Sequence, residues 1–441
     1  MSGKPLNEAP YADYISILKK DLSLAMGCTE PGAVAYASAE AVTVLGKFPE
    51  RLDIKCSGNI IKNVKGVIVP NSGGLRGVDS AAVLGALVGR ADKKLSILEN
   101  VEEKDVKKAS VLLKSDFCHV HLKEGEDSLY IEAIAKGKND TAKVVIAQSH
   151  TNIVLVTYND ETILDKQTNR KNGNRKDGNE NDDKNKISLS IKGILDFAKN
   201  ADINDLKRLL QLQLSVNTAI ADEGLRNPYG SSVGKTLLKT CGNDIKTRAK
   251  AKAAAGSDAR MGGSSMPVVI NSGSGNQGIT VTVPVAEYAY ELCAGEEKLY
   301  RALAISNLVS IHIKNHIGKL SAFCGAVSAA CGSGAAITYL DGGGYEEICS
   351  TITNTAANVS GIICDGAKAS CAAKIASSID AAIMGHEMTK SKKTFPCGEG
   401  IVKDDIEETI DNIGLIGKEG MKETDIEIMH LMLGDRDFGN C

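Results

Sequence analysis

Residues 116–160 read DFCHVHLKEGEDSLYIEAIAKGKNDTAKVVIAQSHTNIVLVTYND, and this stretch decides the fold class. It contains four runs rich in β-branched residues, DFCHVHL, SLYIEAIAK, AKVVIAQS and NIVLVTYND, which are divided by polar segments that include GEDS, GKND and HT. Short β-branched runs between turn residues are typical of strands that hairpins connect. The pattern therefore predicts an antiparallel meander in the N-terminal part of the chain.

The residues before this stretch predict both helices and strands. Apolar residues recur at helical spacing in residues 10–25, which indicates an amphipathic helix. Thr29 fits the N-cap of a second helix, and Pro31 suits the first turn of that helix. Residues 51–70 contain two β-rich segments, RLDIKCS and KGVIVP, and are expected to be extended.

The residues after the meander change character twice. Residues 166–186, KQTNRKNGNRKDGNENDDKNK, contain no apolar side chain and cannot bury enough surface to become ordered. From residue 187 onward helical patterns dominate, for example in EKLYRALAISNLVSIHIKNHIG and KASCAAKIASSIDAAIMGHEM. The sequence therefore predicts the α+β class. We expect an α+β domain with an antiparallel sheet over residues 1–165, a disordered insertion or linker over 166–186, and a mostly α-helical domain over 187–441.

Composition limits the kinds of function that this chain can have. The 441 residues are 43% apolar and 24% charged, with a net charge of −3, so the chain lacks the basic excess of a general nucleic-acid binder. No apolar run reaches the length of a membrane span, and the N-terminus lacks the features of a signal peptide. We therefore expect a cytoplasmic protein whose cysteines are reduced thiols.

The cysteines are distributed unevenly along the chain. Seven of the twelve fall between Cys293 and Cys397. One interpretation is that they are small buried apolar residues, but such clustering also favours a metal site. Familiar motifs for dinucleotides, phosphates, serine nucleophiles and zinc proteases are missing from the sequence. His119 and His121 alternate along an expected strand, where we interpret them as exposed side chains rather than metal ligands.

The spacing of four cysteines suggests which of them could share one site. Cys324 and Cys331 are seven residues apart, which in a straight helix is a rise of about 10 Å. That distance favours only one of them as a ligand, and Gly325 beside Cys324 would let the backbone approach a bulky inorganic group. Cys364 and Cys371 are also seven apart, but an Asp-Gly turn between them could bring both thiolates to one centre. Three thiolates from two segments suit a [4Fe–4S] cluster with one iron left open.

Two glycine-rich loops could bind a substrate carboxylate. In NSGSGNQG, glycine permits the backbone conformations that present several N–H groups to an anion, although a tight turn between helices explains the pattern equally well. The candidate substrate-binding residues of this loop are Asn271, Ser272, Ser274 and Asn276. The second loop, VPNSGGLRG, contains Arg76, which could pair with a carboxylate.

Cys28 lies just before the helix that Thr29 is expected to cap. A thiol at a helix N-terminus has a lowered pKa and could act as a base or a nucleophile. A buried structural cysteine is the alternative interpretation.

Five segments together resemble a known family. GCTEPGAVA, VPNSGGLRG, NSGSGNQG, SAFCGAV and ICDGAKASC are similar to segments of the iron–sulfur L-cysteine desulfidases and of their uncharacterised relatives. The C-terminal half is also distantly similar to the catalytic chain of the iron–sulfur L-serine dehydratases. The resemblance covers nearly the whole chain except 166–186.

The resemblance implies a [4Fe–4S] cluster on Cys324, Cys364 and Cys371, with Cys28 as the proton acceptor. Cys293, Cys331 and Cys349 are not carried over as ligands. Lys368 lies within the cluster motif and is interpreted as a partner for a carboxylate or for the cluster charge.

The implied reaction is a lyase reaction. The open iron would act as a Lewis acid for the β-substituent of an amino acid, and soft iron suits a thiolate leaving group. L-Cysteine would give pyruvate, ammonia and hydrogen sulfide without pyridoxal phosphate. The alternatives are an iron–sulfur serine or threonine dehydratase and a non-catalytic iron–sulfur redox sensor. We interpret the final residue, Cys441, as a stray cysteine rather than a ligand of the open iron.

The expected partner is a small amino-acid substrate, with neither nucleic acid nor a membrane. Whether the chain forms a homo-oligomer is left open by the sequence.

Overall fold

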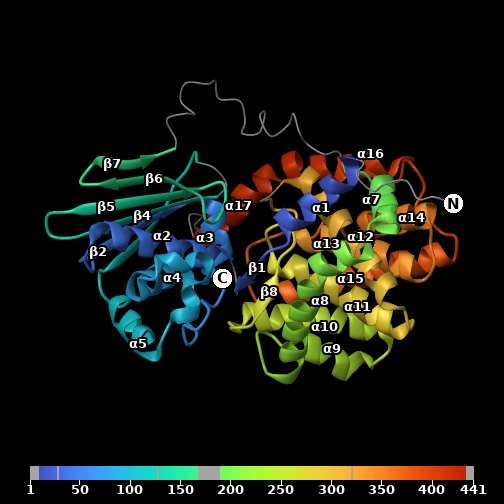
Figure 1. Ribbon diagram of the computed structural model, residues 1–441, viewed down its shortest axis with the longest axis horizontal. Coiled ribbons are helices and arrows are strands. Elements are labelled where there is room, and N and C mark those ends of the chain that lie inside the picture. The colour runs from blue at the N-terminus through green and yellow to red at the C-terminus, as the bar shows by residue number, and fades with distance from the viewer. Residues whose placement is uncertain (1–8, 27–28, 127–128, 167–188, 319–320, 434–441) are drawn as a thin grey trace.

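A computed structural model of the chain describes residues 9–26, 29–126, 129–166, 189–318 and 321–433. It has an N-terminal region built on a six-stranded sheet and a C-terminal region made almost entirely of helices (Figure 1). The strands of the large sheet are β2 (Arg51–Cys56), β3 (Cys118–Leu122), β4 (Tyr130–Lys136), β5 (Thr141–Ala147), β6 (Ile153–Tyr158) and β7 (Glu161–Asp165). The expected α+β class is therefore confirmed.

The helices before the linker all precede the meander. They are α1 (Ala9–Asp21), α2 (Thr29–Leu45), α3 (Gly58–Lys65), α4 (Gly77–Val88), the 3-10 helix η1 (Ala91–Asn100) and α5 (Glu103–Leu112). The helix expected over residues 10–25 is present as α1, but it ends at Asp21, and the last residues of the expected range lie in the short strand β1 (Leu24–Met26).

The C-terminal region contains the helices that the sequence indicated, together with several shorter elements. Its elements are α7 (Ile191–Asn200), α8 (Ile203–Arg226), α9 (Val233–Cys241), α10 (Ile245–Met261), β8 (Pro267–Val269), α11 (Gly275–Glu291), α12 (Glu296–Ile317), α13 (Gly325–Leu340), α14 (Tyr345–Val359), α15 (Cys371–Lys390), α16 (Ile406–Leu415), the π-helix η3 (Ile416–Gly420) and α17 (Lys422–Leu433).

The strand order of the large sheet is β3-β2-β4-β5-β6-β7. Strands β4 to β7 pair antiparallel in sequence order, as the meander pattern predicted, with β7 as an additional strand. The prediction was wrong for β3, which pairs parallel with β2 and does not touch β4. A parallel pair needs a long crossover, and α3, α4, η1 and α5 provide it between β2 and β3.

A second correction concerns residues 51–70, which were expected to be extended. Helix α3 occupies the middle of this range, and the segment KGVIVP at its end is not a strand either. Helix α3 ends within it at Lys65, and the residues that follow form an isolated bridge between Ile68 and Arg76 rather than a strand. The segment is nevertheless buried, because Val67 and Val69 are fully enclosed. Its β-branched residues therefore reflect burial in a tight loop and not membership of the sheet.

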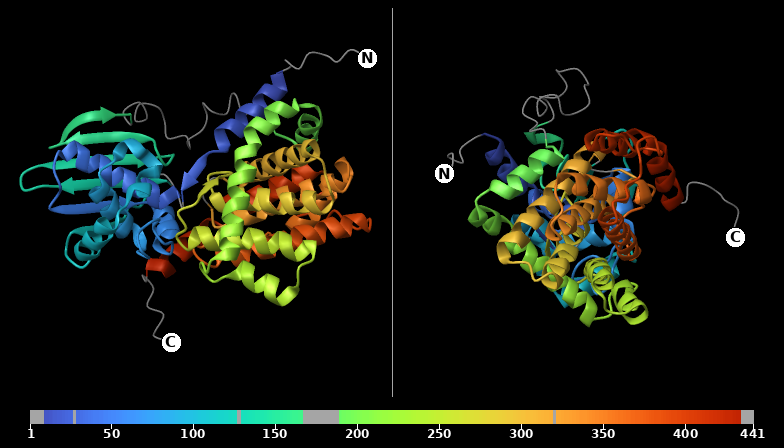
Figure 2. Two further views of the ribbon diagram at one scale, coloured as in Figure 1. Left: turned by 60° about the horizontal axis from the view of Figure 1, so that its bottom comes forward. Right: turned by 90° about the vertical axis from the view of Figure 1, so that its right-hand side faces the viewer.

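Helices α2 and α4 cover one face of the sheet (Figure 2). Their small residues let these two helices pack closely. A Cβ added to Gly85 of α4 would lie 2.1 Å from the carbonyl oxygen of Ala35 in α2. The same device recurs in the helical region, where a Cβ at Gly332 would lie 2.3 Å from the carbonyl oxygen of Ser306. The abundance of glycine and alanine thus serves close helix packing.

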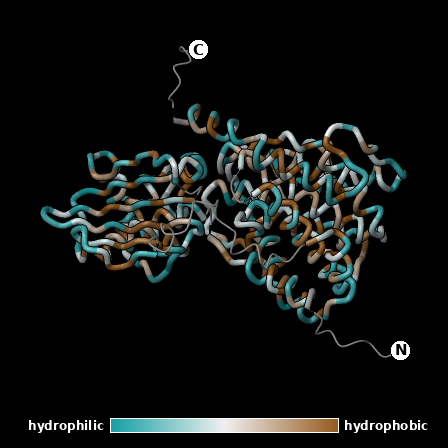
Figure 3. The backbone as a smooth tube through the Cα atoms, turned by 90° about the horizontal axis from the view of Figure 1, so that it is seen from above, coloured by the Kyte–Doolittle hydropathy of each residue, from teal (hydrophilic) through white to brown (hydrophobic). Residues whose placement is uncertain are grey.

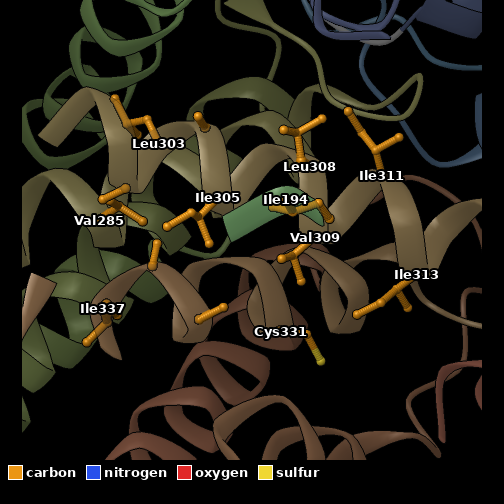
Figure 4. Close-up of a cluster of buried hydrophobic side chains, with 14 of the residues drawn as sticks. Ile194, Val285, Leu303, Ile305, Leu308, Val309, Ile311, Ile313, Cys331 and Ile337 are labelled. Carbon is orange, nitrogen blue, oxygen red and sulfur yellow. The ribbon is translucent and has the colours of Figure 1, made fainter. Parts of the chain in front are cut away.

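Apolar residues concentrate inside each region, and polar ones dominate the outer turns (Figure 3). In the helical region, α12 and α13 pack side by side, and Val309, Ile313 and Cys331 belong to the same buried cluster (Figure 4). Cys331 has no exposed surface. This position fits the expectation that Cys331 is not a ligand together with Cys324.

The two regions are joined by elements from both ends of the described chain. Helix α1 packs on α7 and α12, and strand β1 pairs antiparallel with β8. Helix α17, red in Figure 1, packs on α3 of the N-terminal region. The expected linker at 166–186 lies outside the described residues, apart from Lys166. Among the described helices, none combines the length and apolar composition that a membrane crossing requires.

Candidate active site

A cavity of about 130 Å³ lies where α2 and α3 face the helical region. Cys324, Cys364 and Cys371 all line it, so the structure brings the three cysteines that the sequence singled out to one place. A wider cleft of about 710 Å³ opens beside β1 and β8, but no cysteine lines it. The small cavity is therefore the candidate active site.

Cys324 and Cys364 lie close together because their segments pair through the backbone. The amide of Cys324 donates to the carbonyl oxygen of Ile362 at 3.0 Å, and the amide of Cys364 donates to that of Ala322 at 2.5 Å. Between these two hydrogen bonds, Phe323 and Ile363 form an antiparallel bridge. This short ladder fixes the relative position of the two cysteines.

Cys371 reaches the cavity through the turn that the Asp-Gly pair was expected to form. Helix α14 ends well before Cys364, and α15 begins at Cys371, so the two cysteines do not share one straight helix. Gly366 has a φ of 93°, a conformation that favours glycine. A Cβ there would lie 2.1 Å from the carbonyl oxygen of Lys62, so the turn also packs tightly against α3.

Asp365 anchors the turn between the two cysteines. Its carboxylate forms ion pairs with Lys368 and Lys374, and Lys374 Nζ also donates to the carbonyl oxygen of Ile363 at 2.8 Å. Burial acts to raise the pKa of Asp365, but the hydrogen bonds from the two lysines outweigh it and hold that pKa below its usual value. The carboxylate is therefore charged and keeps the loop closed.

The cavity makes the cysteine side chains poor acids on their own. Burial raises the pKa of Cys324 to about 12, with a further contribution from Cys364, and burial also raises the pKa of Cys371. A bound cation would reverse this effect, because metal coordination deprotonates a thiol. Among the described residues, no three such ligands converge on a single metal ion. A cluster has a different requirement, since each cysteine binds its own iron atom.

The glycine-rich loop before α11 contributes Ser272, Ser274 and Asn276 to the lining of the cavity. Asn276 Oδ1 is buried and has no hydrogen-bond partner within the part of the chain that the structure describes. Asn271 does not line the cavity, because it is fully buried and its side-chain amide donates to Asn307 Oδ1 at 2.9 Å. Its hydrogen bond to Asn307 ties the glycine-rich loop to α12.

Two other residues that the sequence singled out do not line the cavity and make other contacts instead. Arg76 does not line the cavity, and its Nη1 donates to the carbonyl oxygen of Gly66 at 3.1 Å. Lys368 does not line it either, and its Nζ is held by Asp365. Cys28 and Cys441 lie outside the described residues, so their roles stay predictions.

Several cavity residues were not singled out by the sequence. Glu30 belongs to α2, is 9% exposed, and accepts hydrogen bonds from Asn63 at 3.1 Å and from Thr29 at 3.0 Å. Arg260, at the end of α10, is 3% exposed. A Cβ at Gly275 would lie 2.5 Å from Arg260 Nε, so this glycine lets the guanidinium lie directly against the start of α11.

Two buried lysines complete the charges of the cavity. Lys62 is 3% exposed and forms an ion pair with Asp425 of α17. Lys314 is 6% exposed, and burial lowers its pKa to about 8. Glu30 was detectable as the acidic residue of the GCTEP segment, whereas Lys62 and Lys314 lie in ordinary helical patterns that carry no such signal.

Comparison with known proteins places the chain in a family. The family model described as serine dehydratase alpha chain matches residues 92–430. A UPF0597 protein of Desulfitobacterium hafniense (strain Y51) is 50% identical over 432 residues, which cover 96% of this chain and 97% of that protein. The chain belongs to the UPF0597 family and carries a serine dehydratase alpha-chain domain.

Other UPF0597 proteins show the same full-length similarity. A relative from Lachnoclostridium phytofermentans is 48% identical over 96% of this chain and 100% of its own length. One from Treponema denticola is 44% identical over 98% of this chain and 100% of its own length. These names state no activity. The serine dehydratase alpha-chain domain, however, indicates a lyase of the amino-acid dehydratase type, and it includes all three cavity cysteines but neither Glu30 nor Lys62.

Proposed function

We propose that this UPF0597 protein is an iron–sulfur lyase that eliminates the β-substituent of a small L-amino acid, with L-cysteine as the substrate. The products would be pyruvate, ammonia and hydrogen sulfide. The observation that carries the proposal is the convergence of Cys324, Cys364 and Cys371 on one small cavity beside a glycine-rich loop.

The donor set and its surroundings fit a [4Fe–4S] cluster. The three cysteines would hold it, and they come from a backbone ladder and a clamped turn rather than from mobile loops. With three protein thiolates, one iron has no cysteine ligand and can supply a Lewis acid for the β-substituent. The tight positions of Gly325 and Gly366 leave little freedom for these ligands to move.

The carboxylate of the substrate is assigned to Arg260 and to the start of α11. The Arg260 guanidinium is almost completely buried, and a buried guanidinium pairs strongly with a carboxylate. Helix α11 runs for 17 residues from Gly275, and its first amide groups and positive dipole end favour an anion at the same place. Ser274 and Asn276 line the cavity at this end of the helix.

The ammonium group of the substrate is assigned to Glu30. Glu30 is the cavity carboxylate that the N-terminal region contributes, and Thr29 and Asn63 orient its two oxygens. Arg260 and Glu30 come from different regions of the chain, so an α-amino acid would bridge them. Such two-point binding selects amino acids over simple thiols or carboxylic acids.

Cys28 is the proposed acceptor of the α-proton. It directly precedes Thr29, where α2 begins, and a helix N-terminus favours the thiolate form. Removal of the α-proton and departure of the β-substituent would leave aminoacrylate, which hydrolyses to pyruvate and ammonia.

L-Serine is the second candidate substrate. The match to a family model described as serine dehydratase alpha chain favours it, because that name specifies a β-hydroxyl leaving group. We prefer L-cysteine because the GCTEPGAVA and ICDGAKASC segments resemble those of the desulfidases, and because soft iron favours a sulfur ligand.

The cluster assignment is tested by replacing one ligand. Cys364→Ala should abolish the visible absorbance of the anaerobically reconstituted cluster, whereas Cys349→Ala should retain it. Cys349 is a suitable control because it packs against the helical core and does not line the cavity. Full cluster retention in Cys364→Ala would remove the assignment.

Amino-acid recognition is tested separately by Glu30→Gln. The loss of one charge-assisted hydrogen bond should weaken L-cysteine binding about 10- to 100-fold. The affinity for 3-mercaptopropionate, which has the same thiol and carboxylate but no amino group, should stay unchanged. Equal losses for both compounds would exclude Glu30 as the ammonium partner.

A further inference from the structure

Lys314 is a buried cation of the cavity that the proposed reaction has not yet used. It lies in the last turn of α12, lines the cavity together with Cys324 and Cys364, and is 6% exposed. It comes from the C-terminal helical region, whereas Glu30, which is assigned to the amino group of the substrate, comes from the N-terminal region.

Lys314 differs from the other lysines near the site in its partners. Lys62 pairs with Asp425, and Lys374 pairs with Asp365. Across the described ranges, no carboxylate forms an ion pair with Lys314. The groups whose negative charge favours its ammonium are Cys364 and Cys324, while the charge of Lys62 opposes it.

An ammonium buried without a counter-ion is unfavourable, because it loses water and gains no compensating charge. A fold keeps such a group where an anion balances it in the working state. Here the balancing charges would be thiolates. Three cysteine thiolates and the sulfur of a bound substrate would bring negative charge to the wall of the cavity that Lys314 occupies.

We propose that Lys314 is the counter-cation for anionic sulfur in this site. It balances the ligand thiolates, and it stabilises the charge that the substrate sulfur gains when the C–S bond breaks and its electron pair stays on sulfur. The α-proton goes to the base, so the sulfur leaves as an anion. The inference rests on the proposed iron–sulfur lyase function and adds to it the residue that favours a sulfur leaving group electrostatically.

The direct test is the midpoint potential of the reconstituted cluster, measured without substrate. Removing a nearby positive charge makes the addition of an electron harder, so Lys314→Met should shift the potential to more negative values. Lys314→Arg keeps the charge and should stay near the wild-type potential. Lys250→Met is the control for a general charge effect, because Lys250 is partly buried and paired with Asp380, and neither of these two residues lines the cavity.

Steady-state kinetics provide a second test of the role of the Lys314 charge. Lys314→Met should lower kcat for L-cysteine more than it changes KM, and Lys314→Arg should restore most of kcat. Lys314→Gln is the second neutral variant, and it keeps the proposal testable if Lys314→Met fails to fold. Iron content and circular dichroism establish that each compared variant is folded and loaded.

The outcomes separate this inference from the proposed function. A more negative potential in the neutral variants, with normal values in the arginine and Lys250 variants, supports the role of Lys314. An unchanged potential in both neutral variants overturns that role while leaving the lyase proposal intact. A wild-type protein that binds no cluster under anaerobic reconstitution overturns both.

Discussion

Replacement of Gly366 by alanine tests how the cysteine turn docks against α3. Gly366 adopts a φ of 93°, which an alanine side chain disfavours. The added Cβ would also lie 2.1 Å from the backbone carbonyl oxygen of Lys62, far inside van der Waals contact. Neither problem can be solved by rotating a side chain, so the turn must move away from α3.

The expected loss in the free energy of unfolding is the sum of two costs. The left-handed backbone conformation costs alanine about 1–2 kcal/mol. The clash adds about 1–3 kcal/mol, as is usual when a group is forced into a packed interior. We therefore expect Gly366→Ala to lower the free energy of unfolding by about 2–5 kcal/mol and to weaken cluster binding, because the turn carries Cys364 and Cys371 at its two ends.

Gly342→Ala carries the first cost without the second. Gly342 has a φ of 96°, and nothing lies within 4 Å of the position that its Cβ would take. This variant should lose only about 1–2 kcal/mol and keep its iron. Urea unfolding of the two iron-free variants, together with their iron content after reconstitution, gives the comparison.

The reasoning fails if the two glycine variants are equally stable and bind equal amounts of iron. That result would mean that the turn does not press against α3, and that the N-terminal region does not help to hold the cysteines in place.

Three further predictions follow from other contacts. Asp425→Asn leaves the buried ammonium of Lys62 without its counter-ion and should lower the free energy of unfolding, measured in urea, by about 2–3 kcal/mol. This loss is smaller than that expected for a fully buried ion pair, because Asp425 keeps some solvent contact. An unchanged free energy of unfolding would mean that α17 is not docked on α3. Cys28→Ser should keep the cluster spectrum but lose most turnover of L-cysteine, and near-normal turnover would exclude Cys28 as the base. Burial acts to raise the pKa of Glu407, but hydrogen bonds led by that from His312 hold it below its ordinary value of 4.5. Its stabilising contribution is thus present above pH 4.5 and is lost as the pH falls through the lowered pKa. Glu407→Gln should flatten the acid side of a plot of Tm against pH, and an unchanged acid slope would refute this role.

The fold was predictable where local patterns and packing agree. The β-branched runs of β4 to β6 and the long helical patterns of α12 and α15 were enough to identify these elements. The pairing of β3 with β2 was not predictable in this way, because β3 looks like the first strand of the meander. Its parallel pairing with β2 depends on the long crossover through α3, α4, η1 and α5, which local patterns do not reveal. KGVIVP misled because burial in a loop selects the same β-branched residues as a strand.

The site was predictable to the extent that it depends on neighbours in sequence. The Asp-Gly turn between Cys364 and Cys371 is a local feature, and the structure contains it. Arg260 and Glu30 were not predictable as partners in one cavity, since they are brought together only by packing of the two regions. Arg76 carries the right charge in a suggestive loop, yet its guanidinium binds the Gly66 carbonyl oxygen instead.

The most direct test of the central claim is an anaerobic experiment on one preparation of the wild-type protein. Iron and acid-labile sulfide are counted after reconstitution, and the same sample is assayed with L-cysteine and with L-serine. The account predicts a [4Fe–4S] stoichiometry, with pyruvate and sulfide formed in equal amounts from L-cysteine. A loaded cluster that turns over neither amino acid would contradict it.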